Sequence, residues 1–252
     1  LLDTLIGSHP DFVVLEEKPA LEAIRKSLDA RPGGFIAALT ELDESGRSAL
    51  SKSYLGDVER ILGEPVGHRR LLDKLPLNIL MLPLIRRIFP ATRVIMALRH
   101  PADVCLSCFF QEFDYRQSPA MANFLSMQDT VDFYGKVMAL WQLYQQALPL
   151  EMHTIRYEDL VTDTEARMRA LFDFLQCPWD ARILEHHREV RRRGTIDTPS
   201  YHQVSQPIYT QARYRWRNYA AELAPWLDTL HAWADRLGYQ PPPAPGTESD
   251  NA

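Results

Sequence analysis

The stretch of sequence best suited to ligand chemistry is residues 99–103 together with Ser107. It follows an apolar run, Arg93–Leu98, that predicts a buried strand, and it opens an apolar-periodic stretch that predicts a helix. Pro101 suits the first helical position, where its fixed φ is compatible with the helix. Open α/β sheets bind ligands beyond the carboxyl ends of their strands. If Arg99 and Ser107 meet there, a guanidinium fork and a hydroxyl could hold a phosphate; the alternative is an Arg that caps a sheet edge and a Ser that fills a helix face.

The elements that must position these residues alternate between strand and helix. Apolar runs predict strands over residues 12–15, 69–74, 93–98 and 153–157, and helical patterns cover 1–8, 19–30, 35–66, 77–89, 101–113, 120–148, 164–175 and 216–238. This alternation predicts an α/β fold with a parallel sheet covered by helices on both faces. No Pro/Gly/Ser linker interrupts the middle, so one domain is expected over residues 1–240, followed by a disordered, proline-rich tail over 241–252.

The composition excludes several classes of protein. The 252-residue chain has a net charge of −5, which argues against a general nucleic-acid binder. No run of residues approaches the about 20 apolar positions of a membrane span. The three cysteines, at positions 105, 108 and 177, lack the second pair that a zinc site would need, so no metal is expected. Their odd number and apolar settings indicate buried thiols in a reducing compartment.

Four separated elements, each near a strand end, point to one family. They are Glu16-Glu17, Asp73-Lys74-Leu75-Pro76, residues 99–107 and Arg156-Tyr157-Glu158-Asp159-Leu160, with a looser fifth element over residues 198–217. In this order they resemble the sulfotransferases that use 3′-phosphoadenosine 5′-phosphosulfate (PAPS). Within that family the chain is most similar to protein-tyrosine sulfotransferases and their bacterial relatives, which often carry TPR repeats. The resemblance covers residues 1–240 and implies a P-loop-NTPase-like, three-layer α/β/α fold with a central parallel sheet.

The resemblance also implies catalytic roles. Glu17 aligns with the general base that takes the proton of the acceptor hydroxyl, and Lys74 with the cation that stabilises the leaving oxygen. Adjacent residues of a strand point to opposite faces, so only one of Glu16 and Glu17 is expected to serve. The alternatives are a surface pair of acids before a helix, and an exposed lysine paired with Asp73.

The nucleotide-binding roles are implied in the same way. Arg99 and Ser107 would hold the 3′-phosphate, and Tyr157 would lie beside the adenine or the phosphate. Ser200 would contact the phosphosulfate. Arg215 stands where the tyrosine sulfotransferases place a lysine before a tryptophan, so the charge is kept but its shape differs. The alternative for Arg215 is a surface arginine.

The implied reaction is sulfonation of a hydroxyl, with a tyrosine of a protein or peptide as the favoured acceptor. A cluster of arginines at positions 188 and 191–193 would suit acidic residues around such a tyrosine, or it is a solvated face. Three alternatives stay open: a carbohydrate or small-molecule sulfotransferase, a P-loop nucleotide kinase, and an inactive, truncated nucleotide-binding module. A homodimer also stays open. The resemblance to the bacterial relatives implies a bacterial cytoplasm in preference to a Golgi lumen.

The family places a loop that binds the 5′-phosphosulfate immediately before the helix that begins this chain. The chain is therefore expected to lack that loop, and it stays open whether the chain as written has activity. Gln206 is neutral where the tyrosine sulfotransferases tend to carry a lysine.

Overall fold

The computed structural model describes residues 1–116, 118–185 and 212–240, and the chain divides into two compact units. Unit 1 comprises Leu1–Ala97, Leu140–Ile155 and Asp163–Tyr209; unit 2 comprises Leu98–Ala139, Arg156–Thr162 and Thr210–Ala252. The expected tail over residues 241–252, and the expectation of a single domain over 1–240, stay predictions.

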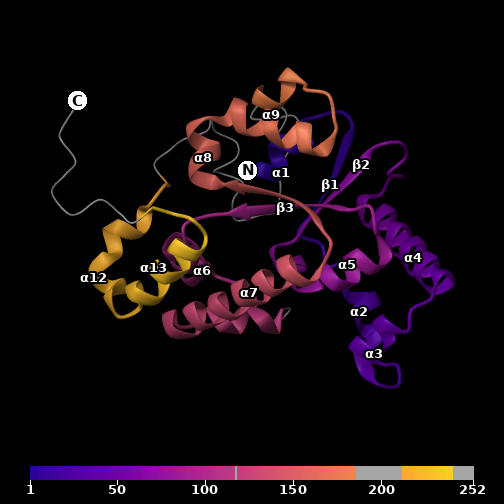
Figure 1. Ribbon diagram of the computed structural model, residues 1–252, viewed down its shortest axis with the longest axis horizontal. Coiled ribbons are helices and arrows are strands. Elements are labelled where there is room, and N and C mark those ends of the chain that lie inside the picture. The colour runs from indigo at the N-terminus through magenta and orange to yellow at the C-terminus, as the bar shows by residue number, and fades with distance from the viewer. Residues whose placement is uncertain (117, 186–211, 241–252) are drawn as a thin grey trace. The chain divides into compact units, whose positions relative to one another are not determined.

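A parallel pair of strands positions the first candidate residues in unit 1. Strands β1 (Phe12–Glu16) and β2 (Arg70–Lys74) run side by side (Figure 1), with Phe12 opposite Arg70 and Glu16 opposite Lys74. Both strands therefore end at the same edge. This register places the acidic end of β1 beside the basic end of β2.

Helices cover this pair and supply the core of unit 1. The helices are α1 (Leu2–Gly7), α2 (Glu22–Asp29), α3 (Gly34–Thr40), α4 (Glu44–Leu62), α5 (Leu82–Ile88) and α9 (Thr164–Leu175), with 3₁₀ turns η1 (Pro76–Met81) and η3 (Ala181–Glu185). Leu15 of β1 is buried in one cluster with Leu28 of α2, Val58 of α4 and Leu84 of α5. Burying side chains of this size contributes roughly 1.5–3 kcal/mol each, so β1 is firmly anchored.

Unit 2 is organised around the helix that follows the third strand. Its elements are α6 (Pro101–Phe110), η2 (Pro119–Phe124), α8 (Tyr157–Thr162), η4 (Arg215–Tyr219), α12 (Ala220–Leu223), η5 (Ala224–Trp226) and α13 (Leu227–Arg236). Helix α13 packs against α6 (Figure 1), and the apolar face of α6 is buried with Trp216 and Leu230. Pro101 begins α6, as predicted.

Three further elements contribute residues to both units. Helix α7 spans Met127–Ala147, and strands β3 (Arg93–Leu98) and β4 (Glu151–Arg156) pair in a second two-stranded sheet. The chain is thus an α/β protein, as predicted, and is mostly helical. Within the described residues the four strands pair two by two, where the sequence predicted one continuous sheet.

Prolines explain where the predicted helices differ from the observed ones. The helix expected over residues 77–89 is a 3₁₀ turn followed by α5, because Pro83 has no N–H for the preceding turn and is tolerated only near a helix start. Pro225 divides the helix expected over 216–238 in the same way. Tyr157, expected to end the fourth strand, instead begins α8.

No helix in the described part of the chain is long and apolar enough to cross a membrane.

Candidate functional site

The ends of β1 and β2 bring the two predicted catalytic residues into contact in unit 1. Lys74 Nζ lies 2.6 Å from Glu17 Oε1, and the backbone N–H of Glu17 donates to the Lys74 carbonyl over 2.7 Å. The Glu17 and Lys74 side chains are 42% and 30% exposed. An acid and a cation therefore stand together where solvent, or a substrate, can reach them.

Glu16 and Glu17 do not point to opposite faces as expected, because both side chains reach Lys74, and which of them serves as the base stays a prediction. Glu16 Oε1 also lies 3.5 Å from Lys74 Nζ. The strand ends at Glu16, and Glu17 adopts a left-handed conformation with a φ of 50°. Because Glu17 has left the strand, the alternation of faces no longer separates it from Glu16. A left-handed non-glycine residue costs about 1–3 kcal/mol and is typical of functional sites.

The carboxylates around Lys74 determine its protonation. Burial by itself lowers the pKa of Lys74, but the negative charges of Asp3 and Glu17 outweigh it and raise that pKa above its ordinary value. Burial and the nearby Asp3 carboxylate raise the pKa of Glu16. Lys74 is therefore an ammonium ion at neutral pH, as a group that stabilises negative charge must be.

Asp3 belongs to this cluster, and the sequence reading did not single it out. Its Oδ2 lies 3.1 Å from Lys74 Nζ, although the two residues come from α1 and the end of β2. The sequence signal that could have drawn attention to it is a single charged residue in a short, mostly apolar helix.

Arg99 is the predicted phosphate-binding residue of unit 2, and it lies at the turn between β3 and α6. Its guanidinium lies 5.0 Å from the Tyr157 ring centroid, so the structure brings these two predicted nucleotide-binding residues together. Arg99 Nη2 donates to the Ala212 carbonyl over 2.8 Å. Its Nε lies 3.8 Å from Asp103 Oδ2 but makes no hydrogen bond within the described residues.

Asp103 anchors this turn from inside α6. The residue is buried, and its Oδ1 accepts a hydrogen bond of 2.8 Å from the backbone N–H of Trp216. Burial raises the pKa of Asp103, against the lowering effects of that N–H and of Arg99. One carboxylate thus ties α6 to η4 and faces the guanidinium of Arg99.

Ser107 lies further along α6, and Arg215 begins η4. Ser107 is exposed and, among the described contacts, none joins it to Arg99. The Arg215 guanidinium lies 5.9 Å from the ring centroids of Phe110 and Tyr219. Because Ser107 and Phe110 are three residues apart on α6, they share a face. Arg215 therefore approaches the face that carries Ser107.

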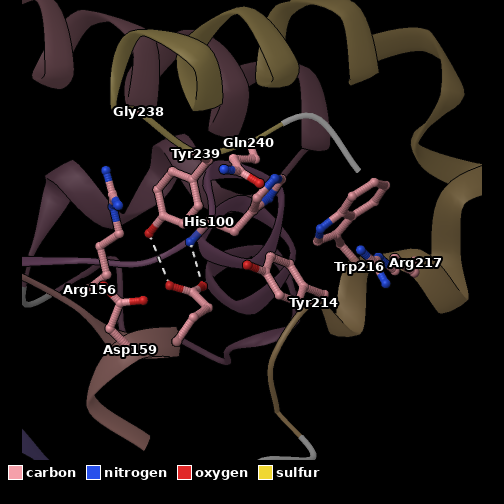
Figure 2. Close-up of a pocket in the computed structure, with 10 residues that line it drawn as sticks. His100, Arg156, Asp159, Tyr214, Trp216, Arg217, Gly238, Tyr239 and Gln240 are labelled. Carbon is pink, nitrogen blue, oxygen red and sulfur yellow. Dashed lines mark hydrogen bonds between the residues drawn. The ribbon is translucent and has the colours of Figure 1, made fainter. Parts of the chain in front are cut away.

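A polar cavity of about 470 Å³ adjoins the Arg99 turn within unit 2 (Figure 2). Figure 2 shows Arg156 and Asp159 on one side of it and Trp216 and Arg217 on the other. Gly238 has a φ of 73° and leaves room for the Arg156 side chain. A Cβ at this position would lie 2.8 Å from Arg156 Nη2.

Glu158, on the wall of this cavity, braces the turn that carries Arg99. It is only 4% exposed; its Oε1 accepts from the His100 backbone N–H over 2.9 Å, and its Oε2 accepts from the Tyr239 hydroxyl over 3.0 Å. Burial lowers the pKa of His100 to about 4, so its ring is neutral. The family motif contained Glu158, but the sequence reading assigned it no role.

A third group of polar side chains could be mistaken for a metal site. His9, Asp11 and Cys177 bring possible ligand atoms within 4.8 Å of one another in unit 1. However, the Asp11 backbone N–H donates to His9 Nδ1 over 3.1 Å, and His9 Nε2 lies 3.1 Å from the Pro178 carbonyl. That pattern assigns the ring proton to Nε2, which leaves no lone pair there for a metal. The prediction that the protein uses no metal stays a prediction.

Several predicted residues lie outside the described part of the chain. They are Ser200, Gln206, Arg188 and the arginines at 191–193. Their roles stay predictions.

Comparisons with known proteins identify the family of this chain. The model of the sulfotransferase family matches residues 1–181. Protein-tyrosine sulfotransferase 1 of Danio rerio is 26% identical over 260 residues, which cover 96% of this chain and 69% of that protein. Protein-tyrosine sulfotransferase A of Caenorhabditis elegans is 31% identical over 90 residues, covering 34% of this chain and 24% of that protein. An uncharacterized protein of Aquifex aeolicus is 27% identical over 244 residues, or 94% of this chain, yet the chain spans only 31% of that relative.

Solved structures show the same fold. The sulfotransferase domain from the curacin biosynthetic pathway superimposes with a TM-score of 0.61 and 19% identity, covering 96% of this chain and 93% of that domain. The sulfotransferase domain from the Synechococcus PCC 7002 olefin synthase also gives a TM-score of 0.61, with 20% identity and coverage of 96% and 90%. The family match covers more than half of the chain, and the strand-end motifs occupy the expected elements. The chain therefore belongs to the sulfotransferase family.

Proposed function

We propose that this protein transfers a sulfuryl group from PAPS to the hydroxyl of a tyrosine in a protein or peptide. The observation that carries the proposal is the contact of 2.6 Å between Glu17 Oε1 and Lys74 Nζ at the matched ends of β1 and β2. Family membership indicates sulfuryl transfer in place of the nucleotide-kinase alternative. Two relatives are named as protein-tyrosine sulfotransferases, which supports the choice of acceptor.

Glu17 and Lys74 divide the chemistry between them. A phenol has a pKa of about 10 and keeps its proton at neutral pH. Glu17 takes that proton as the phenol oxygen forms its bond to sulfur. The bond between sulfur and the bridging oxygen breaks, and Lys74 stabilises the negative charge that develops on that oxygen. PAPS supplies the sulfuryl group and leaves as the 3′,5′-bisphosphate.

The surroundings of Arg99 fit a doubly charged phosphate. The Arg99 side chain is 26% exposed, so an anion can reach its guanidinium, which is a strong charge-assisted donor. The Tyr157 ring fixes the plane of the guanidinium from one side. Ser107 is exposed and can add a hydroxyl donor. These residues would distinguish a nucleotide with a 3′-phosphate from one without it.

The acceptor is tested by direct assay of the full-length protein with ³⁵S-labelled PAPS. We expect label in tyrosine-containing peptides with acidic neighbours, and none in matched peptides with phenylalanine in place of tyrosine. Transfer only to carbohydrates or small phenols would replace the proposed acceptor but keep the reaction. Binding of the nucleotide without transfer to any acceptor would favour the inactive-module alternative. A homodimer and a cytoplasmic location stay predictions.

Replacing Arg99 by alanine is expected to weaken binding of adenosine 3′,5′-bisphosphate by roughly 10- to 100-fold, because it removes a charge-assisted pair worth about 1.5–3 kcal/mol. Binding of AMP, which lacks the 3′-phosphate, should change far less. Isothermal titration calorimetry measures both affinities. Arg236→Ala is the matched control, since Arg236 is exposed and stacks on Trp233. Equal losses for the two nucleotides would refute the assignment.

A further inference from the structure

We propose that Asp3 is a positioning residue, which fixes the ammonium group of Lys74 for sulfuryl transfer. The inference rests on the proposed function, because that function gives Lys74 its role. Glu17 and Lys74 stand at the ends of β1 and β2, whereas Asp3 comes from α1.

Burial distinguishes Asp3 from the other two carboxylates around Lys74. Its side chain is 10% exposed, whereas those of Glu16 and Glu17 are 29% and 42% exposed. An ion pair shielded from water is stronger and less screened by salt than an exposed one. Of the three contacts to Lys74 Nζ, the one made by Asp3 is therefore best suited to hold the ammonium in place.

The two oxygens of Asp3 have separate partners. Oδ1 accepts from the backbone N–H of Thr4 over 2.9 Å. Oδ2 lies 3.1 Å from Lys74 Nζ. Because Oδ1 is held by the start of α1, the direction of Oδ2 is set before any ligand arrives. Asp3 therefore offers Lys74 a rigid acceptor.

This arrangement matters when Glu17 acts as the base. An ammonium group has three N–H donors, and three carboxylates surround Lys74. When Glu17 takes the phenol proton it becomes neutral and its attraction for Lys74 falls. The flexible four-carbon stem of a lysine would then regain its freedom. Asp3 keeps the ammonium charged and in place through that step.

The first experiment measures the pKa of Lys74 directly, through the ¹³Cε chemical shift of labelled lysine in the full-length protein. The charged groups that face Lys74 within the described residues are Asp3 from α1, and Glu16 and Glu17 from the end of β1. Removing one nearby opposite charge lowers the pKa of a lysine by about 1 or more. We expect that decrease in Asp3→Asn and recovery in Asp3→Glu. An unchanged Lys74 titration in Asp3→Asn would overturn the proposal.

The second experiment is a double-mutant cycle on turnover. Asp3→Asn is expected to lower kcat by roughly 10-fold, with little change in the KM for PAPS. The pH above which activity is lost should also be lower in this variant. If Asp3 acts through Lys74, Asp3→Asn should cause no further loss in the Lys74→Met background. Equal losses in both backgrounds would show a role unrelated to Lys74 and would overturn the proposal.

Controls separate this inference from folding defects and from the proposed function. Asp29→Asn is a matched control, because Asp29 is 60% exposed and lies 4.0 Å from Arg25. A thermal melting curve for each variant shows whether it folds. If Asp3→Asn does not fold, the conservative variant Asp3→Glu still tests the proposal. A wild-type protein without sulfuryl transfer would refute the proposed function, whereas the Lys74 titration would still decide whether Asp3 holds the ammonium.

Discussion

Replacing Glu17 by glutamine is expected to lower kcat by about 10²- to 10⁴-fold, the usual contribution of a general base. Glutamine keeps the size and polarity of the side chain but cannot accept the phenol proton. Nucleotide affinity should change little, because the residues assigned to the 3′-phosphate lie elsewhere in the sequence, at Arg99 and Ser107. Steady-state kinetics with a tyrosine peptide give kcat, and calorimetry gives the affinity for the bisphosphate.

Glu22→Gln is the control for this variant. Glu22 also lies in unit 1, but its carboxylate pairs with Arg25 on the exposed side of α2 and contacts no predicted site residue. It should retain wild-type turnover. If Glu17→Gln turned over at the wild-type rate, Glu17 would not be the base, and Glu16, at 3.5 Å from Lys74 Nζ, would become the residue to test.

Replacing Lys74 by methionine is expected to lower kcat by about 10²- to 10³-fold, as removal of one preorganised group that stabilises an oxyanion usually does. Methionine keeps the apolar stem and removes the charge. The loss should be smaller for PAPS analogues that carry a better leaving group, because less charge on the bridging oxygen then needs stabilisation. Single-turnover kinetics measure the chemical step apart from product release.

The control for Lys74→Met is Lys26→Met. Lys26 is 69% exposed and pairs with Glu22 on α2, so its loss should leave kcat unchanged. Equal turnover of the wild type and Lys74→Met would remove Lys74 from the mechanism. The same variant also leaves Asp3, Glu16 and Glu17 without their shared cation, so its melting temperature must be measured beside its activity.

Much of the candidate site could be predicted from the sequence because its residues stand at the ends of elements. The strands end at residues 16, 74 and 98, and Glu16, Lys74 and Arg99 stand at those ends. In parallel strands these ends meet at one edge, so Glu17 and Lys74 could be expected to lie together without any coordinates. Pro101 marked the start of α6 for a similarly local reason, since its ring is compatible with the first turn.

Local signals also mark where the predicted helices break. Pro83 and Pro225 each divide a stretch that its apolar periodicity predicts as one helix. The loss of a backbone N–H outweighs the periodicity at these positions. Tyr157 is predicted to end the fourth strand, yet it begins α8.

The family, the alternation of strands and helices, and the residue types at the strand ends can all be inferred from the amino-acid sequence, because they depend on local propensity and on the order of the motifs. Which charges meet depends on tertiary packing. The left-handed turn at Glu17 puts two neighbouring glutamates on one lysine, and the packing of α1 brings Asp3 to the same ammonium. Such contacts join residues far apart in the chain, so they follow from strand register and helix packing, which no local pattern encodes.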